Sequence, residues 1–424
     1  MHVFFSGIGG AGIGPLALIA KQAGYIVSGS DKQPSSYIDS LRAEGVEVMV
    51  GEDVEKLAEI HEKLPINWMV YSSALPKENP NHPFIKFAKA NNIPSTKRDL
   101  FINKLLKDTN QQMLAVAGTH GKTTTTAMLV WMFKQLKLPI SYSVGAKLSF
   151  GAAGEFNKDA KYFIYEADEY DRNFLSFNPL LSIIPGIAYD HPDVYPTQED
   201  YNQAFLQFFK QSREVIAHPE DVRKLTTTLE NGVLDQLDVL YEITLAGEVN
   251  RKNAQLVIEA CYRLKLADKD KLVNLVNQFP GVSRRFEKLV KNVYTDYAHT
   301  PEKIEGALQL AHEVARDNVV VVYEGLHNTR QHFIREQLKT LFSSVKKLYI
   351  VPSYLAREDE SLEMLTPEKL CDITAGTTDC SPAKLNDNLK NKIEMHAQAG
   401  DTVLCLTAGG GGSLDEWLRK EIST

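Results

Sequence analysis

A glycine-rich turn between an apolar run and a helical run most strongly constrains the fold of this chain. The apolar run spans residues 113–117, and residues 124–135 have the pattern of a helix. Such a strand–turn–helix unit directs several backbone N–H groups into one concavity at the positive end of the helix, where a phosphate group binds readily. The residues predicted to bind the phosphates of a nucleotide are Gly118, Thr119, His120, Gly121, Lys122, Thr123 and Thr124.

The spacing within this turn is shorter than in the common phosphate-binding loop G-x-x-x-x-G-K-[ST]. Val116 stands where the first glycine of that pattern would be, and the remaining pattern is G-T-x-G-K-T. The chemistry is retained, because Lys122 can reach the β- and γ-phosphates and the Thr123 hydroxyl can bind Mg²⁺. We therefore predict a nucleoside triphosphate site, with Lys122 as a catalytic residue.

A second glycine-rich turn follows the first apolar run of the chain. Gly7, Gly9, Gly10 and Gly12 match G-x-G-x-x-G, and Asp31 follows Gly12 by 19 residues. This pattern is typical of a loop that places a diphosphate at a helix N-terminus. A nicotinamide dinucleotide, a flavin and a UDP-sugar all carry a diphosphate, so this loop by itself leaves all three ligands open.

Acidic residues crowd the end of another apolar run. Residues 166–171 (EADEYD) contain four carboxylates, and Glu166 lies closest to the predicted strand 162–166. A carboxylate at this position of a nucleotide-binding domain can hold Mg²⁺. His191 follows the next predicted strand, and ligands of parallel sheets gather at the carboxyl ends of the strands. The predicted metal-binding residues are Thr123, Glu166 and His191.

Short apolar runs alternate with amphipathic stretches along all 424 residues, which predicts α/β domains built on parallel sheets. We expect three such domains in series: a Rossmann-like domain at 1–108, a central P-loop ATPase domain at 109–279 and a second Rossmann-like domain at 280–424. Predicted strands cover residues 2–5, 25–29, 46–50, 68–71, 113–117, 162–166, 181–185, 319–323, 347–351 and 402–406. Predicted helices cover residues 13–22, 37–44, 124–135 and 253–264.

Charge and composition argue against several classes of protein. The net charge of -7, from 47 basic and 54 acidic residues, argues against a nucleic-acid partner. No uninterrupted run of 18 apolar residues is present, which argues against a membrane span. The four cysteines form no C-x-x-C pair, so we expect buried thiols without a disulfide framework, and a cytoplasmic location.

Taken in this order, the motifs resemble those of the Mur ligases, the ATP-dependent, amide-forming enzymes of peptidoglycan synthesis. The resemblance extends from residue 2 to the last predicted strand. Within the family, the first glycine loop and the EADE sequence are most similar to members that join L-alanine to UDP-N-acetylmuramate. Beyond the loops described above, the resemblance rests on Ser72, Ser73, Asn250, Asn253, Gly281, Arg284, Arg285, Asp296 and His299.

The resemblance implies a reaction with ATP as co-substrate and two Mg²⁺ ions. The carboxylate of UDP-N-acetylmuramate attacks the γ-phosphorus of ATP, and the amine of the amino acid then attacks the resulting acyl phosphate. Lys122 and the metals neutralise the developing charge, while His191, His299 and His327 are candidates for the base. The implied UDP-sugar-binding residues are Gly7, Gly9, Gly10, Gly12, Asp31, Ser72 and Ser73. Further ATP-binding residues are Asn250, Asn253, Arg285 and Asp296, and the amino-acid-binding residues are Arg330 and His327.

The acceptor of the reaction is left open by departures from the family pattern. Members that use L-alanine carry T-N where this chain has Pro185 and Gly186, and Q-P-H-R-Y-[TS]-R where residues 324–330 read EGLHNTR. The EYD sequence at 169–171 is closer to members that attach an L-Ala-D-Glu-diaminopimelate tripeptide to the same UDP-sugar. A non-catalytic UDP-sugar-binding protein and an NAD-dependent oxidoreductase are the alternatives from other classes. The sequence predicts no oligomeric state.

Overall fold

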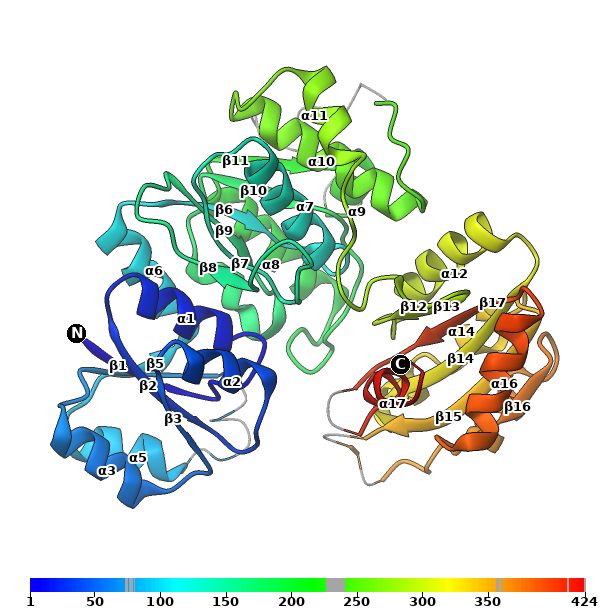
Figure 1. Cartoon of the computed structure of the whole chain (residues 1–424), viewed down its shortest axis with the longest axis horizontal. Helices are drawn as coiled ribbons and strands as arrows, with labels where there is room; N and C mark the ends of the chain where they lie inside the picture. Colours follow the sequence, from blue (N-terminus) through cyan, green and yellow to red (C-terminus); the bar gives the residue numbers. More distant parts are fainter. Residues whose placement is uncertain are drawn as a thin grey trace. The chain divides into compact units, whose positions relative to one another are not determined.

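The computed structural model describes the chain except for residues 73, 74, 76–78, 80, 226–240, 356, 357, 360, 410, 411, 423 and 424. Three sheets with flanking helices (Figure 1) confirm the predicted α/β class. The chain divides into two units. Unit 1 comprises Met1–Ile243 and Asn253–Phe279 and holds the first two sheets, whereas unit 2 comprises Thr244–Lys252 and Pro280–Thr424 and holds the third.

The first sheet has the strand order β3-β2-β1-β4-β5, and all of its strand pairs are parallel. Alternate residues of β1 serve opposite faces, since Phe4 packs with helices α3 and α5 while Val3 and Phe5 pack with α1, α2 and α6. The strands are β1 (His2–Ser6), β2 (Ile26–Asp31), β3 (Glu47–Val50), β4 (Trp68–Tyr71) and β5 (Ser95–Lys97). The helices are α1 (Gly14–Gln22), α2 (Ser36–Ala43), α3 (Val54–Lys63), α5 (Pro83–Ala90) and α6 (Arg98–Thr109).

The second sheet has the order β11-β10-β6-β9-β7-β8 and is parallel except for the β7–β8 pair. One of its faces shares a continuous apolar cluster with the first sheet, which joins the two sheets into unit 1. The strands are β6 (Gln112–Val116), β7 (Ser141–Ser143), β8 (Gly154–Glu155), β9 (Tyr162–Glu166), β10 (Leu181–Ile184) and β11 (Glu214–Ala217). The helices are α7 (Lys122–Gln135), the 3-10 helix η1 (Tyr170–Ser176), α8 (Gln198–Gln211), α9 (Pro219–Leu225), α10 (Glu248–Arg263) and α11 (Lys269–Val276).

The third sheet has the order β12-β13-β17-β14-β15-β16 and is parallel except for the β12–β13 pair. Helices α12, α14 and α15 cover one face, and α16 and α17 cover the other. The strands are β12 (Glu287–Val290), β13 (Val293–Asp296), β14 (Val319–Leu326), β15 (Lys347–Tyr354), β16 (Cys380–Pro382) and β17 (Thr402–Leu406). The helices are α12 (Pro301–Ala315), α13 (Asn328–Phe333), α14 (Arg335–Leu341), α15 (Pro367–Thr374), α16 (Asp387–Gln398) and α17 (Leu414–Glu421).

Of the fourteen elements that the sequence predicts, eleven have both ends within two residues of the observed ends; the exceptions are β14, β15 and α10. Strand β14 continues three residues beyond its prediction because Glu324, although charged, is buried and accepts hydrogen bonds from the N–H groups of Ala408 and Leu414. Helix α10 begins at Glu248, five residues before the predicted start. The prediction missed its first turn because these residues are polar and show no apolar periodicity. No helix in the described part of the chain is long and apolar enough to span a membrane.

The expectation of four unpaired thiols is wrong for one pair of cysteines. Cys371 of α15 and Cys380 of β16 form a disulfide, whereas Cys261 and Cys405 are free and buried. The turn that connects α15 to β16 brings the two Cα atoms to 5.4 Å, within the range that a disulfide requires. The spacing of nine residues does not reveal this proximity, because it depends on how the chain returns to the sheet.

Candidate active site

The glycine-rich turn at 118–123 connects β6 to α7 at the carboxyl edge of the second sheet. Gly121 precedes the first turn of α7 with a φ of 77°, a conformation that other residues rarely adopt. A side chain at this position would also place its Cβ 2.7 Å from the Cβ of Pro185. The turn therefore depends on glycine for both conformation and space, and it presents the N-terminus of α7 to a ligand.

Lys122, at the start of α7, is neutralised by Glu169 of the acidic loop. Its Nζ lies 2.6 Å from Oε2 of Glu169, whose side chain is only 1% exposed. Burial by itself would raise the pKa of Glu169, but the Lys122 ammonium and His191 outweigh it and hold the pKa at about 2. Glu169 is therefore ionised and supplies the counter-charge of the Lys122 ammonium.

The structure brings Thr123 and Glu166 together as predicted neighbours. The Thr123 hydroxyl donates to Oε1 of Glu166 at 2.9 Å, and the backbone N–H of Gly145 donates to Oε2 at 2.9 Å. His191 lies apart from this pair: its Nε2 is 3.6 Å from Oε1 of Glu169 and 3.8 Å from Oδ2 of Asp190. Within the described residues, no three His, Cys, Asp or Glu side chains converge on one point as a metal site.

A cavity of about 200 Å³ joins the two glycine loops of unit 1. Its lining combines Gly12 of the first loop with Lys122 of the second, and Arg98 and Asp168 lie between them. The remaining lining residues are Ala11, Ser143, Gly145, Tyr165 and Glu166. The candidate phosphate-binding lysine and the candidate diphosphate loop thus face a common space.

Two other carboxylates of the acidic loop pair with cations where β5 ends and α6 begins. Asp168 accepts a hydrogen bond from Nη2 of Arg98 at 3.3 Å, and Asp171 pairs with Lys97. Glu169, between them, faces Lys122 instead. Three of the four carboxylates in this stretch are therefore neutralised by three different cations, which reduces the repulsion among them.

Two side chains of the phosphate loop, Thr119 and His120, contact the segment that follows β10. The Thr119 hydroxyl donates to the carbonyl oxygen of Ala188 at 2.6 Å and lies 2.5 Å from the Tyr201 hydroxyl. The His120 ring packs over Gly186, where a Cβ would overlap it. Gly186 therefore leaves room for His120 in a way that a larger residue would not.

Asn253 is a predicted ATP-binding residue from outside the phosphate loop that the structure brings next to this loop. Its side chain is 1% exposed and would lie 2.9 Å from a Cβ on Gly121, and neither amide atom has a hydrogen-bond partner among the described residues. Unpaired buried amide atoms are costly, so these groups fit a site completed by a ligand. Asn250, one turn earlier, instead donates to the carbonyl oxygen of Ala246 at 2.9 Å.

Two polar side chains form hydrogen bonds to the backbone of the first glycine loop. The N–H of Gly9 donates to Oδ2 of Asp31 at 2.8 Å, and the Ser35 hydroxyl donates to the Gly9 carbonyl oxygen at 2.9 Å. Ser72 lies against Gly7, with its Oγ 3.4 Å from the position of a Cβ there. Ser73, the other predicted residue of this group, lies outside the described residues.

In unit 2, the predicted residues Arg285, Asp296 and His299 gather around Tyr297. The Arg285 guanidinium lies 5.4 Å from the Tyr297 ring, and the His299 ring lies 4.8 Å from it. Asp296 accepts a hydrogen bond from the N–H of Phe286 at 2.8 Å, and burial raises its pKa to about 6 despite the nearby Arg285. This carboxylate, at the end of β13, is therefore easily protonated.

The remaining two predicted residues lie after β14, at the same carboxyl edge of the third sheet. His327 precedes α13 with a φ of 56°, and its Nδ1 lies 3.6 Å from Oε1 of Glu358. Arg330 lies within α13. The sheet order places β17 between β13 and β14, so His327 and Arg330 form a group separate from Asp296.

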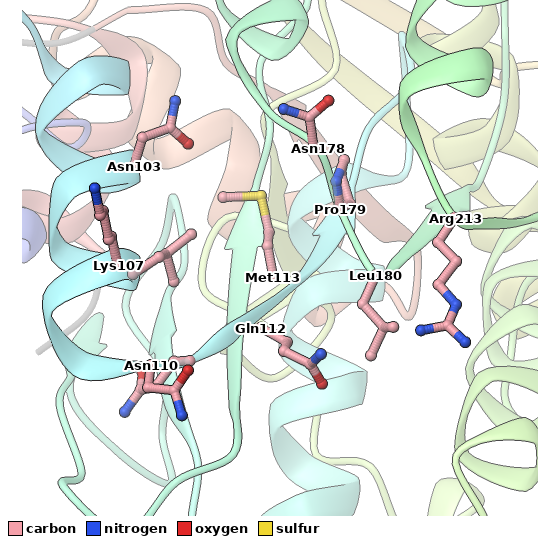
Figure 2. Close-up of a pocket in the computed structure, with 11 residues that line it drawn as sticks. Asn103, Lys107, Asn110, Gln112, Met113, Asn178, Pro179, Leu180 and Arg213 are labelled. Carbon is pink, nitrogen blue, oxygen red and sulfur yellow. The ribbon is translucent and has the colours of Figure 1, made fainter.

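A second cavity lies at the opposite, amino edge of the second sheet. It measures about 440 Å³ and lies between α6 and the starts of β6 and β11. In Figure 2, Met113 lies between Lys107 of α6 and Arg213. No predicted site residue lines this cavity, which separates it from the candidate active site.

Sequence reasoning missed Arg98 and the tyrosines behind the loops. Arg98 follows β5, a strand of three residues that is too short for hydropathy to reveal. Tyr195 donates to the carbonyl oxygen of Glu169 at 2.5 Å, and Tyr201 contacts Thr119. Both tyrosines come from a loop and a helix that the motifs do not include, so only the fold identifies them.

Three family profiles match successive parts of the chain. They are described as "Mur ligase family, catalytic domain" at residues 2–109, "Mur ligase middle domain" at 116–241 and "Mur ligase, glutamate ligase domain" at 284–409. Relatives from Caldicellulosiruptor saccharolyticus and Clostridium acetobutylicum are both named UDP-N-acetylmuramate–L-alanine ligase. Each is 28% identical, and each alignment covers 96% of this chain and 95% of the relative.

Solved structures share the fold over the whole chain. UDP-N-acetylmuramate-alanine ligase from Thermotoga maritima superposes with a TM-score of 0.78 at 22% identity, covering 100% of this chain and 98% of that one. A murein peptide ligase from Psychrobacter arcticus gives a TM-score of 0.68 at 20% identity, with the same coverage. The three profiles together match most of the chain, the arrangement of three α/β sheets agrees with them, and the chain belongs to the Mur ligase family.

Proposed function

We propose that this chain is an ATP-dependent ligase that joins L-alanine to the carboxylate of UDP-N-acetylmuramate through an acyl phosphate. The observation that carries this proposal is the cavity shared by Gly12 of the first glycine loop and Lys122 of the phosphate loop. A UDP-sugar on one loop and ATP on the other would bring their reacting groups together there. The names of the relatives, which match over nearly the whole chain, support the same reaction.

In the first step, a carboxylate oxygen of the sugar substrate bonds to the γ-phosphorus of ATP, and the bond from that phosphorus to the ADP oxygen breaks. Negative charge on the transferring group requires a neutralising cation. Lys122 meets this need once it exchanges Glu169 for the γ-phosphate. The N-terminus of α7 adds partial positive charge at the same place.

The residues present fit the Mg²⁺ that this reaction requires. Thr123 Oγ1 and Glu166 Oε1 lie 2.9 Å apart, and hydroxyl and carboxylate oxygens are the ligands of a hard cation that also keeps waters and substrate phosphates. We place one Mg²⁺ on this pair and a second beside His191 and Glu169. When bound, the metal neutralises charge on the phosphoryl oxygens.

In the second step, the amine of the acceptor bonds to the acyl carbon, and the tetrahedral intermediate expels phosphate. The amine has to lose a proton, for which His191, His299 and His327 are the candidate bases. We assign the UDP-sugar to residues 1–108, ATP to 109–279 with Arg285 and Asp296, and the acceptor to 280–424 with His327 and Arg330. With ATP and a UDP-sugar as substrates, we place the enzyme in the cytoplasm.

A tripeptide acceptor is the second candidate. The EYD sequence at 169–171 is closer to ligases of that type, and a murein peptide ligase shares the fold over the whole chain. Residues 324–330 also depart from the pattern of L-alanine ligases. The two acceptors differ in size and charge, so a direct assay separates them.

The test measures phosphate released from ATP and Mg²⁺ with UDP-N-acetylmuramate, against single amino acids and L-Ala-D-Glu-diaminopimelate. We expect release with L-alanine alone; release only with the tripeptide would make the chain a recycling ligase. Lys122→Ala should lower turnover by at least 100-fold. Lys134→Ala, which removes a lysine near the other end of α7 that pairs with Glu155 at 2.8 Å, is the matched control and should keep activity. No release with any acceptor would contradict the proposal.

A further inference from the structure

Among the described residues that line the active-site cavity, Arg98 is the one cation to which the proposed mechanism gives no role. It begins α6, directly after β5, and lines the cavity together with Lys122. Only 17% of its side chain is exposed. A partly buried guanidinium that faces a cavity requires an explanation, because removing it from water is unfavourable unless its donors are satisfied.

The guanidinium of Arg98 lies against the first glycine loop. A Cβ on Gly12 would overlap its Nη1, so glycine at this position makes room for the arginine. Gly12 lies just before α1 (Gly14–Gln22), where a helix N-terminus favours anionic groups. A positive side chain and a helix N-terminus therefore meet at the same point of the cavity wall.

The hydrogen bonds of Arg98 are incomplete. Nη2 donates to Oδ2 of Asp168 at 3.3 Å, and Nε is buried with no hydrogen-bond partner among the described residues. A guanidinium carries five N–H donors, and an arginine used only to hold Asp168 would be expected to form a shorter, two-pronged pair. The single long bond leaves donors for a ligand.

Its neighbour Lys97 shows what a purely structural residue looks like here. Lys97 pairs with Asp171 of the same acidic loop, but it does not line the cavity. Lys97, at the end of β5, and Arg98, at the start of α6, both pair with the acidic loop. Of these two residues, only Arg98 also lines the cavity between the two glycine loops. The pair offers a matched comparison between a loop contact and a ligand contact.

We infer that Arg98 binds an anionic oxygen of the sugar substrate and positions that substrate toward Lys122. This inference rests on the proposed function and adds a residue to it. Two groups of UDP-N-acetylmuramate could supply the oxygen: the diphosphate and the carboxylate that attacks ATP. UDP-N-acetylglucosamine has the diphosphate but lacks this carboxylate, so it distinguishes the two.

The test is calorimetric titration of the full-length protein with UDP-N-acetylmuramate, UDP-N-acetylglucosamine and ATP. For Arg98→Ala we expect the Kd for UDP-N-acetylmuramate to rise about 10- to 100-fold, since a hydrogen bond to a charged group is lost, while the Kd for ATP changes less than threefold. Arg98→Lys should recover part of the affinity because it restores the charge. Lys97→Ala should bind all three ligands as the wild type does.

Weaker binding of both UDP-sugars would assign Arg98 to the diphosphate, and weaker binding of UDP-N-acetylmuramate alone would assign it to the carboxylate. Equal losses in Arg98→Ala and Lys97→Ala, or a loss of ATP affinity as large as that for the sugar, would overturn the inference and leave Arg98 as a loop contact. Arg98→Lys serves the same comparison if Arg98→Ala does not fold. Wild-type protein that binds neither UDP-sugar would overturn the proposed function first, and the inference with it.

Discussion

The ammonium nitrogen of Lys122 lies 2.6 Å from Oε2 of Glu169, and this ion pair connects the phosphate loop to the acidic loop. Lys122 begins the helix of the phosphate loop, and Glu169 belongs to the acidic loop after β9. The same loop reaches Arg98 through Asp168. If a phosphate replaced the Glu169 carboxylate, the acidic loop could therefore change its contacts with both Lys122 and Arg98.

Glu169→Gln should make the protein depend on ATP for stability. Breaking a buried ion pair by removing one partner costs about 3–5 kcal/mol, because Lys122 stays buried without a counter-charge. The phosphates of ATP supply that charge, so ATP should raise the Tm of the variant more than that of the wild type. Thermal unfolding with and without a non-hydrolysable ATP analogue measures the difference. Glu155→Gln, which breaks the more exposed pair with Lys134, is the control, and an equal ATP effect in all three proteins would contradict the prediction.

Gly121→Ala should destabilise the protein more than Gly24→Ala. Both glycines have positive φ, 77° and 89°, so both substitutions strain the backbone by about 1–2 kcal/mol. Only at Gly121 does the added Cβ also meet Pro185, at 2.7 Å, whereas nothing lies within 4 Å at Gly24. Overpacking adds about 1–3 kcal/mol, and ATP affinity should fall in Gly121→Ala alone. Chemical unfolding and ATP titration test both points, and similar behaviour of the two variants would show that the contact is unimportant.

Tyr201→Phe should weaken ATP binding from behind the phosphate loop. The lost hydroxyl lies 2.5 Å from Oγ1 of Thr119, and both side chains are buried. Losing this hydrogen bond costs about 1 kcal/mol. If the whole cost falls on the ATP complex, the KM for ATP rises about fivefold. Tyr189→Phe is the control, since the Tyr189 hydroxyl donates to the Tyr195 carbonyl oxygen and not to the phosphate loop. The prediction is wrong if both variants have the same KM for ATP.

Asp296→Asn should change how stability depends on pH. Burial raises the pKa of Asp296 to about 6, so the folded state holds this proton more tightly than the unfolded chain, whose value is about 4. The stabilising contribution is therefore present below pH 4 and is lost as the pH rises through 6. Asparagine mimics the protonated form, and we expect the variant to match the wild type near pH 4 and to exceed it by roughly 1–3 kcal/mol at pH 8.

The control for this prediction is Asp401→Asn, which should behave in the opposite way. Lys346 and His396 outweigh the effect of burial and lower the pKa of Asp401, so its charge stabilises the folded state at neutral pH. Removing that charge should therefore lower the Tm at pH 8 and have less effect near pH 4. The two variants measured over the same pH range give differences of opposite sign, and parallel curves would contradict the assignment for Asp296.

Local patterns were sufficient to locate several of the strands. The strands at 68–71, 162–166 and 402–406 are found at the predicted residues, because each is a short apolar run bounded by polar or turn residues. Thr123 and Glu166 meet because Thr123 follows β6 and Glu166 ends the neighbouring parallel strand β9, at the same sheet edge. Neighbouring strand ends are a strong constraint, which makes such pairs predictable once the strands are known.

Contacts between residues of different elements could not be predicted from local patterns. Cys371 and Cys380 form a disulfide although their spacing matches no familiar pattern, and Glu324 extends β14 although a charged residue usually ends a buried strand. In both cases the deciding partner comes from a different element. The identity of that partner depends on packing, not on the local sequence.

The sequence by itself determined the α/β class, the two glycine loops and the acidic loop, because strand and helix periods and glycine turns are local properties of the chain. Only the tertiary structure decided which carboxylate faces which cation. Glu169 pairs with Lys122 and Asp168 pairs with Arg98 because the acidic loop lies between the phosphate loop and the N-terminus of α6. Charge pairing over this range depends on distance in space, and folding alone brings residues 98, 122 and 169 together.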